Sequence, residues 1–410
     1  MSLNTKNILS KQLKLSCKNK LFHIFNNKIN KKTTKQIKSK NILFFSIIDY
    51  KYKYRQRPQH ITDYFGNKDY IVHYFNTSFE KESTKVNKIN KNINNIFLKF
   101  TNKNSKHFKN SISTTNFLSN FNEIKESIDS YIENNNIENG IIFVEFPNWA
   151  YLTEYLKEKY NFKIVFDVLD EYEGFHPDDE VLLDSFRHLI GLTDLVITTS
   201  NFLSKKLKNL NNNVKIIRNG TEFNHFNNHI KPYKNEKPII GYYGALSYWV
   251  DFEKIYHAAT KRPNYDFVII GDFKDSKELF KEKLKNLSNV KFLGKIDYYI
   301  LPKYLNTFDV AIIPFKSDID LIKATNPVKF YEYLSMGKKI VSTDIPELFD
   351  FKDLYVYTCN GNEDFLKSID LCVDKKDNLA SFSEKIAFAE KNDWKHRCNM
   401  INKYINDLYV

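Results

Sequence analysis

Residues 324–343 contain the side chains whose types and spacing most favour ligand chemistry. Asn326 is a preferred N-cap residue, and Pro327 suits the first position of a helix because it has no N–H to leave unpaired there. The first turn then presents the N–H groups of Val328 and Lys329 at the positive end of the helix dipole. With the Lys329 ammonium added, the segment predicts an anion-binding site.

Glu332 follows on the same predicted helix, about 7.5 Å along the axis from Pro327 at about 1.5 Å per residue. If a diphosphate binds at the helix start, an attached ribose reaches this carboxylate, which can accept hydrogen bonds from two neighbouring hydroxyls. The competing interpretation is an ordinary capped helix, ended by Gly337, whose Glu332 faces water. Spacing alone does not separate the two interpretations.

Charged side chains also follow apolar runs in the first half of the chain. Arg57 comes after the run 41–48, and Asp167 and Asp170 come after the run 163–166. Ligands of parallel α/β sheets bind at the carboxyl ends of the strands, so these three are candidate catalytic residues. The alternatives are surface charge for Arg57 and helix capping for the two carboxylates. Which of the two Asp residues would act is open.

Alternating apolar strands and helices in two blocks predict an α/β protein with two Rossmann-like domains facing a cleft. Gly244 follows the first strand of the second block, where its small size lets a ligand approach the backbone. The predicted segments are an N-terminal extension, a first domain, a hinge, a second domain and a C-terminal helix, at residues 1–40, 41–221, 222–237, 238–390 and 391–410.

The positive charge of the chain is concentrated at one end. The 410 residues carry a formal net charge of +13, and residues 1–40 hold eleven Lys and no Asp or Glu, so the remainder is close to neutral. Basic segments with interspersed apolar residues bind anionic membrane surfaces, and a disordered tail is an equally weighted alternative. A nucleic-acid partner is unlikely on these grounds, because a neutral body predicts no basic groove.

The remaining composition favours a cytoplasmic protein, either free or peripheral on the inner face of the membrane. The four Cys residues have no metal-ligand spacing, which predicts reduced thiols and no structural zinc. The sequence contains no run of eighteen apolar residues, so no transmembrane helix is predicted. The first residues also lack the apolar core of a secretory signal.

Residues 327–338 (PVKFYEYLSMGK) and the following strand resemble the donor-binding signature of family 4 GT-B glycosyltransferases of the teichuronic-acid and polysaccharide type. The resemblance extends from about Asn41 to the C-terminus. Its other elements are RPQH at 57–60, VKIIRNGT at 214–221, GYYGALSYWVD at 241–251 and NDWKHR at 392–397.

The resemblance implies transfer of a hexose-type sugar from a nucleotide-diphosphate sugar to a glycan or lipid-linked acceptor, with retention of configuration and without a metal or other cofactor. The first domain would bind the acceptor and the second the nucleotide sugar, and the C-terminal helix would cross back to the first domain. The resemblance also implies backbone contacts to the nucleobase near Lys295. The predicted donor-binding residues are then Gly244, Lys295, Asn326, Val328, Lys329 and Glu332.

Two positions depart from the family pattern. Ala324 stands eight residues before Glu332, where relatives carry a first Glu that touches the donor sugar, so the sugar and the anomeric outcome stay open. Arg218 replaces a Pro of the turn that ends the first domain. The alternative function is a non-catalytic membrane-surface or glycan-binding protein that keeps the GT-B fold.

Overall fold

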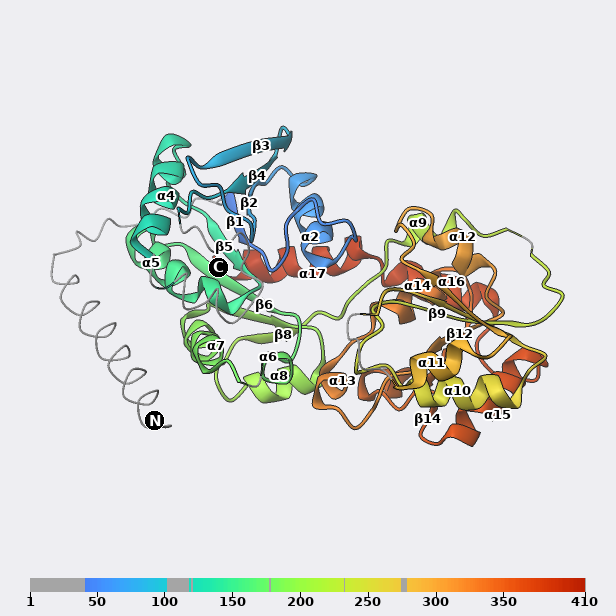
Figure 1. The fold of residues 1–410 in the computed structure, drawn as a ribbon. Coiled ribbons are helices and arrows are strands. Elements are labelled where there is room, and N and C mark those ends of the chain that lie inside the picture. Colours follow the sequence, from blue (N-terminus) through green and yellow to red (C-terminus); the bar gives the residue numbers. More distant parts are fainter. Residues whose placement is uncertain are drawn as a thin grey trace, which may run out of the picture. The chain divides into compact units, whose positions relative to one another are not determined.

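The computed structural model describes residues 41–101, 118, 121–176, 178–231, 233–273 and 279–409. The basic extension 1–40, with its expected membrane contact, lies outside these residues. The described chain forms two β-sheets with helices between most successive strands (Figure 1). The predicted α/β class with two Rossmann-like sheets is therefore confirmed.

The first sheet has eight strands in the order β3-β4-β2-β1-β5-β6-β7-β8. All neighbouring pairs are parallel except β3 and β4, which are antiparallel at one edge. The strands are β1 Asn41–Phe45, β2 Ile71–Phe75, β3 Lys85–Asn90, β4 Ile93–Phe97, β5 Ile141–Val144, β6 Lys163–Val168, β7 Leu195–Thr198 and β8 Val214–Ile216.

The second sheet has six parallel strands in the order β11-β10-β9-β12-β13-β14. The strands are β9 Ile239–Tyr243, β10 Asp266–Ile270, β11 Val290–Gly294, β12 Val310–Ile313, β13 Lys339–Thr343 and β14 Tyr357–Cys359. In both sheets the order reverses beside the first strand of the block, where doubly wound folds bind their ligands.

Helices of both blocks connect the strands. In the first block they are α2 Arg57–Gly66, α4 Phe121–Asn134, α5 Ala150–Tyr160, α6 Tyr172–Phe175, α7 Glu180–Leu192 and α8 Asn201–Leu207, and α9 Phe223–Asn227 lies in the predicted hinge. In the second they are α10 Phe252–Lys261, α11 Leu279–Lys285, α12 Leu301–Asn306, α13 Asp320–Ala324, α14 Val328–Ser335, α15 Asn362–Val373, α16 Phe382–Lys391 and α17 Trp394–Asp407. Two 3-10 turns cover Pro147–Trp149 and Pro346–Phe351.

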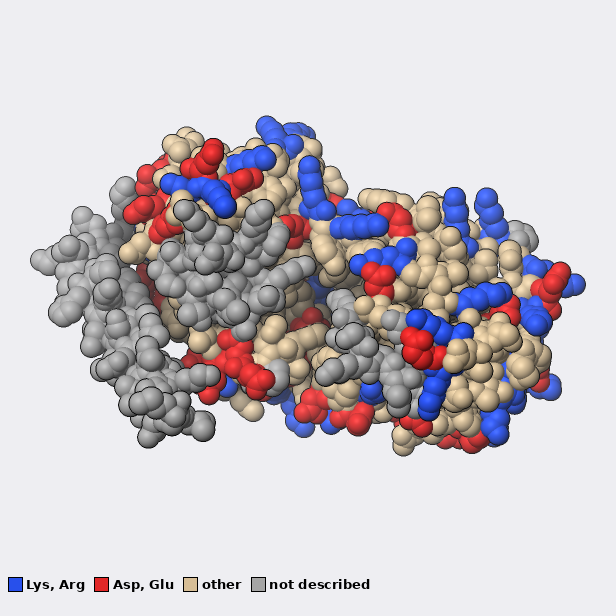
Figure 2. Space-filling view, viewed as in Figure 1, with Lys and Arg blue, Asp and Glu red and all other residues tan. Residues whose placement is uncertain are grey.

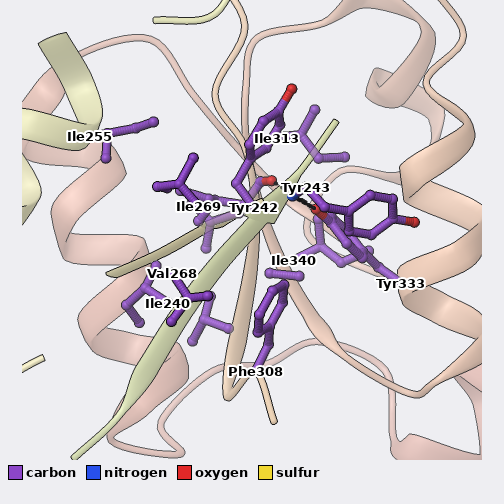
Figure 3. Packing of buried hydrophobic residues seen from close by; sticks show 14 of the residues in the cluster. Ile240, Tyr242, Tyr243, Ile255, Val268, Ile269, Phe308, Ile313, Tyr333 and Ile340 are labelled. Carbon is purple, nitrogen blue, oxygen red and sulfur yellow. Dashed lines mark hydrogen bonds between the residues drawn. The ribbon is translucent and has the colours of Figure 1, made fainter. Parts of the chain in front are cut away.

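The apolar strands are buried on both faces, as helix-covered parallel sheets require. In β1, Leu43 and Phe45 belong to one core cluster and Ile42 and Phe44 to another. The core of the second sheet surrounds β9, where Ile240 and Tyr242 are fully buried (Figure 3). This burial explains why strands such as β1 and β5 are continuous apolar runs rather than alternating patterns.

The last helix, α17, packs on the first sheet, as the resemblance implies (Figure 1). Cys398, Ile401 and Ile405 of α17 share a core cluster with β1 and β2 residues. Trp394 at its start stacks on His60 of α2, with ring centroids 5.0 Å apart. The prediction that the C-terminal helix crosses back to the N-terminal domain is confirmed.

Surface charge is mixed over the described residues on the face drawn in Figure 2. Lys and Arg side chains there are interspersed with Asp and Glu side chains. None of the helices in the described ranges is long and apolar enough to span a bilayer.

Candidate functional site

Helix α14 begins at Val328, with Pro327 as its N-cap residue, so the N-cap assignment of Asn326 is wrong. The Asn326 side chain does not turn back to the first turn of the helix. Its Oδ1 accepts from the backbone N–H of Asn219 at 2.9 Å, and its Nδ2 lies 3.2 Å from the Tyr331 hydroxyl. The side chain therefore forms a hydrogen bond with a residue 107 positions away in the sequence instead of capping its own helix.

The turn after β8 makes three further contacts with the second block: one just before α14, one at the last residue of α14 and one at the 3-10 turn Pro346–Phe351. Asn219 Nδ2 donates to the Asn326 carbonyl at 2.8 Å, and the Thr221 and Ser335 hydroxyls lie 2.9 Å apart. Arg218 pairs with the buried Glu347 at 3.0 Å. The turn predicted to end the first domain therefore positions the proposed anion site of the second.

The amides of Val328 and Lys329 point out of the first turn, and among the described residues no protein atom accepts from them. The Lys329 side chain is half-buried and lies over the rings of Tyr242 and Phe315, with Nζ 5.7 and 5.5 Å from their centroids. No carboxylate in the described part of the chain forms an ion pair with it. Desolvation lowers the pKa of Lys329, and the nearby Glu332 charge opposes that shift.

Gly244 lies beside this ammonium at the carboxyl end of β9. Its φ is +145°, which side-chain-bearing residues rarely adopt, and a Cβ here would lie 2.7 Å from Lys329 Nζ. Gly271, after β10, is equally restricted, because a Cβ there would lie 1.8 Å from the Gly244 carbonyl oxygen. Because the glycines have no side chains, an anion can approach the backbone at Gly244 and the Lys329 amine at the same time.

Glu332 is buried, with 8% of its surface exposed, so the interpretation in which it faces water is wrong. Its carboxylate accepts a hydrogen bond from the Tyr243 hydroxyl. Burial raises its pKa to about 7, although the Tyr243 hydrogen bond and the Lys329 charge act in the opposite direction. Tyr243 is itself held by Tyr333, whose hydroxyl accepts from the Tyr243 amide at 3.4 Å (Figure 3). Anion site and carboxylate thus share one helix and one strand end.

Lys295 follows β11, and its side chain is exposed. It forms an ion pair with Asp272 at 2.5 Å, which raises its pKa. The ammonium is therefore directed to the loop after β10. The expected backbone contact with a nucleobase near Lys295 stays a prediction.

Arg57 and Asp167 form a buried ion pair at the carboxyl ends of the first sheet. Arg57 Nε and Nη2 donate to the two Asp167 oxygens at 2.7 and 3.0 Å, and Nη1 donates to the Ile217 carbonyl at 3.0 Å. The two side chains are 5% and 0% exposed. Burial raises the pKa of Asp167 even though Arg57 lowers it. Both side chains face protein partners, and their catalytic assignment stays a prediction.

Asp170 lies beyond the end of β6 and differs from Asp167. It is half-buried, and no hydrogen-bond donor within the described ranges contacts its carboxylate. Burial raises its pKa to about 6. Of the two carboxylates that the sequence left open, Asp170 is the one without an ion-pair partner among the described residues, and its catalytic assignment stays a prediction.

Glu145 is a further carboxyl that the sequence analysis does not single out. It is fully buried after β5, where Ser46 Oγ donates to Oε2 at 3.1 Å and Oε1 has no partner among the described residues. Burial and the adjacent Asp167 raise its pKa well above the usual range. Glu145 directly follows an apolar run, as Asp167 does, and this position is the sequence signal that could have identified it as a candidate.

The described residues contain no group of three or more His, Cys, Asp or Glu side chains arranged to hold a metal ion. Ala324 is 1% exposed and packs in a core cluster with first-sheet residues. At the position where the family resemblance implies a first Glu, this chain therefore has a buried core residue.

Comparison with known proteins finds a matching family and a similar sequence. Residues 224–407 match the family described as Glycosyl transferases group 1. A Bacillus subtilis protein named for teichuronic acid biosynthesis, the glycosyltransferase TuaH, is 25% identical over 264 residues, which are 59% of this chain. The match spans 66% of that relative's length.

Solved structures share the fold. Sucrose-phosphate synthase from Thermosynechococcus elongatus superposes with a TM-score of 0.69 at 13% identity, over 90% of this chain and 99% of that one. Anabaena Alr3699/HepE, solved in complex with UDP-glucose, superposes with a TM-score of 0.62 at 13% identity, over the same shares. At these identities the likeness concerns the fold alone.

Proposed function

We propose that this protein, a GT-B glycosyltransferase of the teichuronic-acid type, transfers a hexose-type sugar from a nucleotide-diphosphate sugar to a glycan or lipid-linked acceptor in surface polysaccharide synthesis. The transfer would retain configuration and use no metal or other cofactor. The complexes of HepE with UDP and UDP-glucose support a nucleotide-sugar donor. The similarity to TuaH supports a polysaccharide acceptor.

One observation carries the proposal: the Lys329 ammonium has no ion-pair partner in the described chain and lies beside Gly244 at the start of α14. A departing diphosphate gains negative charge in the transition state. Fixed donors aimed at that charge lower the barrier most effectively where water is excluded. The first-turn amides, the helix dipole and the ammonium supply such donors without a metal ion.

Glu332 provides the test of donor binding. Replacing it by Gln is expected to weaken nucleotide binding by about 1–3 kcal/mol, because the ribose hydroxyls lose a charged acceptor. Calorimetric titration with UDP, GDP, ADP and CMP would first identify the nucleotide and then measure the loss. Equal affinity of the variant and the parent protein for that nucleotide would contradict the proposed ribose contact.

Glu332→Gln, which is expected to weaken nucleotide binding, is expected to raise the stability of the fold at high pH. The pKa of Glu332 in the folded chain, about 7, lies above its ordinary value of 4.5. Stability linked to this proton is therefore fully present below about pH 4.5 and lost as the pH rises through 7. We expect Glu332→Gln to be more stable than the parent protein at pH 8, by on the order of 3 kcal/mol, and about equally stable at pH 4.5. Urea unfolding at the two pH values measures the difference.

Asp170 is proposed to orient the acceptor hydroxyl, while the leaving phosphate takes the proton. Asp170→Asn is expected to lower the transfer rate roughly tenfold without changing nucleotide affinity, since only a charged hydrogen bond to the acceptor is lost. Transfer by the parent protein should decline below about pH 6, where this carboxylate becomes protonated. Persistence of that acidic decline in the Asn variant would assign it to another group.

A further inference from the structure

Three aromatic side chains lie at the carboxyl ends of strands from both sheets. Phe175 ends α6 after β6, and it is 38% exposed. Tyr248 and Trp249 lie on the loop after β9, where Tyr248 is 40% exposed and Trp249 is partly buried. The Phe175 and Trp249 rings contact edge to face at 6.1 Å, and the Tyr248 and Trp249 rings at 5.1 Å.

Other contacts hold these loops in place. The Trp249 carbonyl accepts from the Lys316 amide at 2.8 Å. On the other loop, Lys206 binds Glu171 at 2.9 Å and also Glu173. The aromatic group is therefore presented by anchored backbone, with two of its three rings open to solvent by more than a third of their surface.

Each of the two loops also carries a residue of the proposed reaction site. The β9 loop begins at Gly244, beside the Lys329 ammonium, and the β6 loop contains Asp170, whose half-buried carboxylate forms no ion pair among the described residues. The aromatic residues follow five residues after each of these positions, at Trp249 and Phe175. A molecule resting on the rings lies on the same loops as the donor anion site and the acceptor-orienting carboxylate.

We propose that Phe175, Tyr248 and Trp249 form an acceptor subsite that stacks on the apolar face of a sugar ring. Pyranose rings have a C–H face that packs on aromatic rings, and their hydroxyl edge needs acceptors such as the Asp170 carboxylate. That pairing of exposed rings with a carboxylate favours a glycan over an acyl chain, which offers no hydroxyl to Asp170. The inference rests on the proposed function, because it places the acceptor of that reaction.

Tryptophan fluorescence can test the subsite directly. The chain has three Trp residues, and Trp149 and Trp394 are 0% and 6% exposed, so acrylamide quenching mainly reports on Trp249. With UDP present, methyl glucoside, galactoside, N-acetylglucosaminide and glucuronide are titrated as probes, followed by cello- and malto-oligosaccharides. We expect at least one of them to protect Trp249 from quenching. Absence of protection by the whole set would overturn the proposal.

Substitutions separate stacking from general effects. Phe175→Ala should raise the half-saturating concentration of the protecting sugar roughly fivefold. The matched control is Tyr233→Ala, because Tyr233 is 59% exposed in the segment before β9. Equal sugar affinity of the Phe175 and Tyr233 variants would refute the stacking. UDP titration by calorimetry is the parallel readout: nucleotide binding without sugar protection refutes only the subsite, whereas failure of UDP, GDP, ADP and CMP alike to bind refutes the proposed function.

Discussion

Replacing Asp167 by Asn is expected to destabilise the protein by roughly 3–5 kcal/mol, because the Arg57 guanidinium is left buried without its counter-charge. The pair joins α2 to the end of β6 across 110 residues of sequence, and both side chains are buried. Burial raises the pKa of Asp167, and the Arg57 charge and hydrogen bond oppose that shift. Urea unfolding, followed by far-UV circular dichroism, measures the loss.

A double substitution distinguishes this structural role from a catalytic one. Arg57→Met with Asp167→Leu removes both charges while keeping similar volumes, so it should recover most of the stability lost by Asp167→Asn. If Asp167→Asn instead unfolds like the parent protein and loses sugar transfer, the pair acts in the reaction rather than in holding the sheet edge.

Replacing Lys329 by Met is expected to weaken binding of the nucleoside diphosphate by roughly 3 kcal/mol, more than a hundredfold, with loss of transfer. The reason is local: the ammonium is the charged group beside the free amides of Val328 and Lys329 at the start of α14. Calorimetry should compare UDP with uridine, or the corresponding pair for whichever base binds. The variant should lose affinity for the nucleoside diphosphate but not for the nucleoside, since the nucleoside has no negative charge to interact with Lys329.

The stability of the Lys329 variant provides a second check. An ammonium whose pKa is lowered by burial destabilises the ligand-free fold, so Lys329→Met should be at least as stable as the parent protein. Lys323→Met serves as the control, because Lys323 lies on the neighbouring α13 and pairs with the exposed Asp320 at 2.7 Å. Loss of uridine affinity equal to the loss of UDP affinity would show that the substitution distorts the site.

Most strands of the two sheets could be predicted because their signals are local, but the polar β3 and the three-residue β14 were not predicted. Runs such as 41–45 and 141–144 are apolar without alternation, and burial between two layers of helices requires that pattern. The helix that carries Lys329 and Glu332 is likewise marked by its own residues, since Pro327 precedes it and Gly337 follows it with a φ of +65°. Spacing within one helix therefore sufficed to place the two groups one turn apart.

Partners distant in sequence were decided by tertiary structure alone. Asn326 is a residue type that often caps helices, yet it forms hydrogen bonds with Asn219. The reason is that the folded chain brings the turn after β8 against the start of α14. The sequence placed Asp167 and Asp170 alike after the end of a strand, and only the packing of α2 gave Asp167 a guanidinium partner, while Asp170 is half-buried without an ion pair among the described residues. Charge type and helical spacing are properties of short segments, whereas burial and pairing depend on which segments the two sheets bring together.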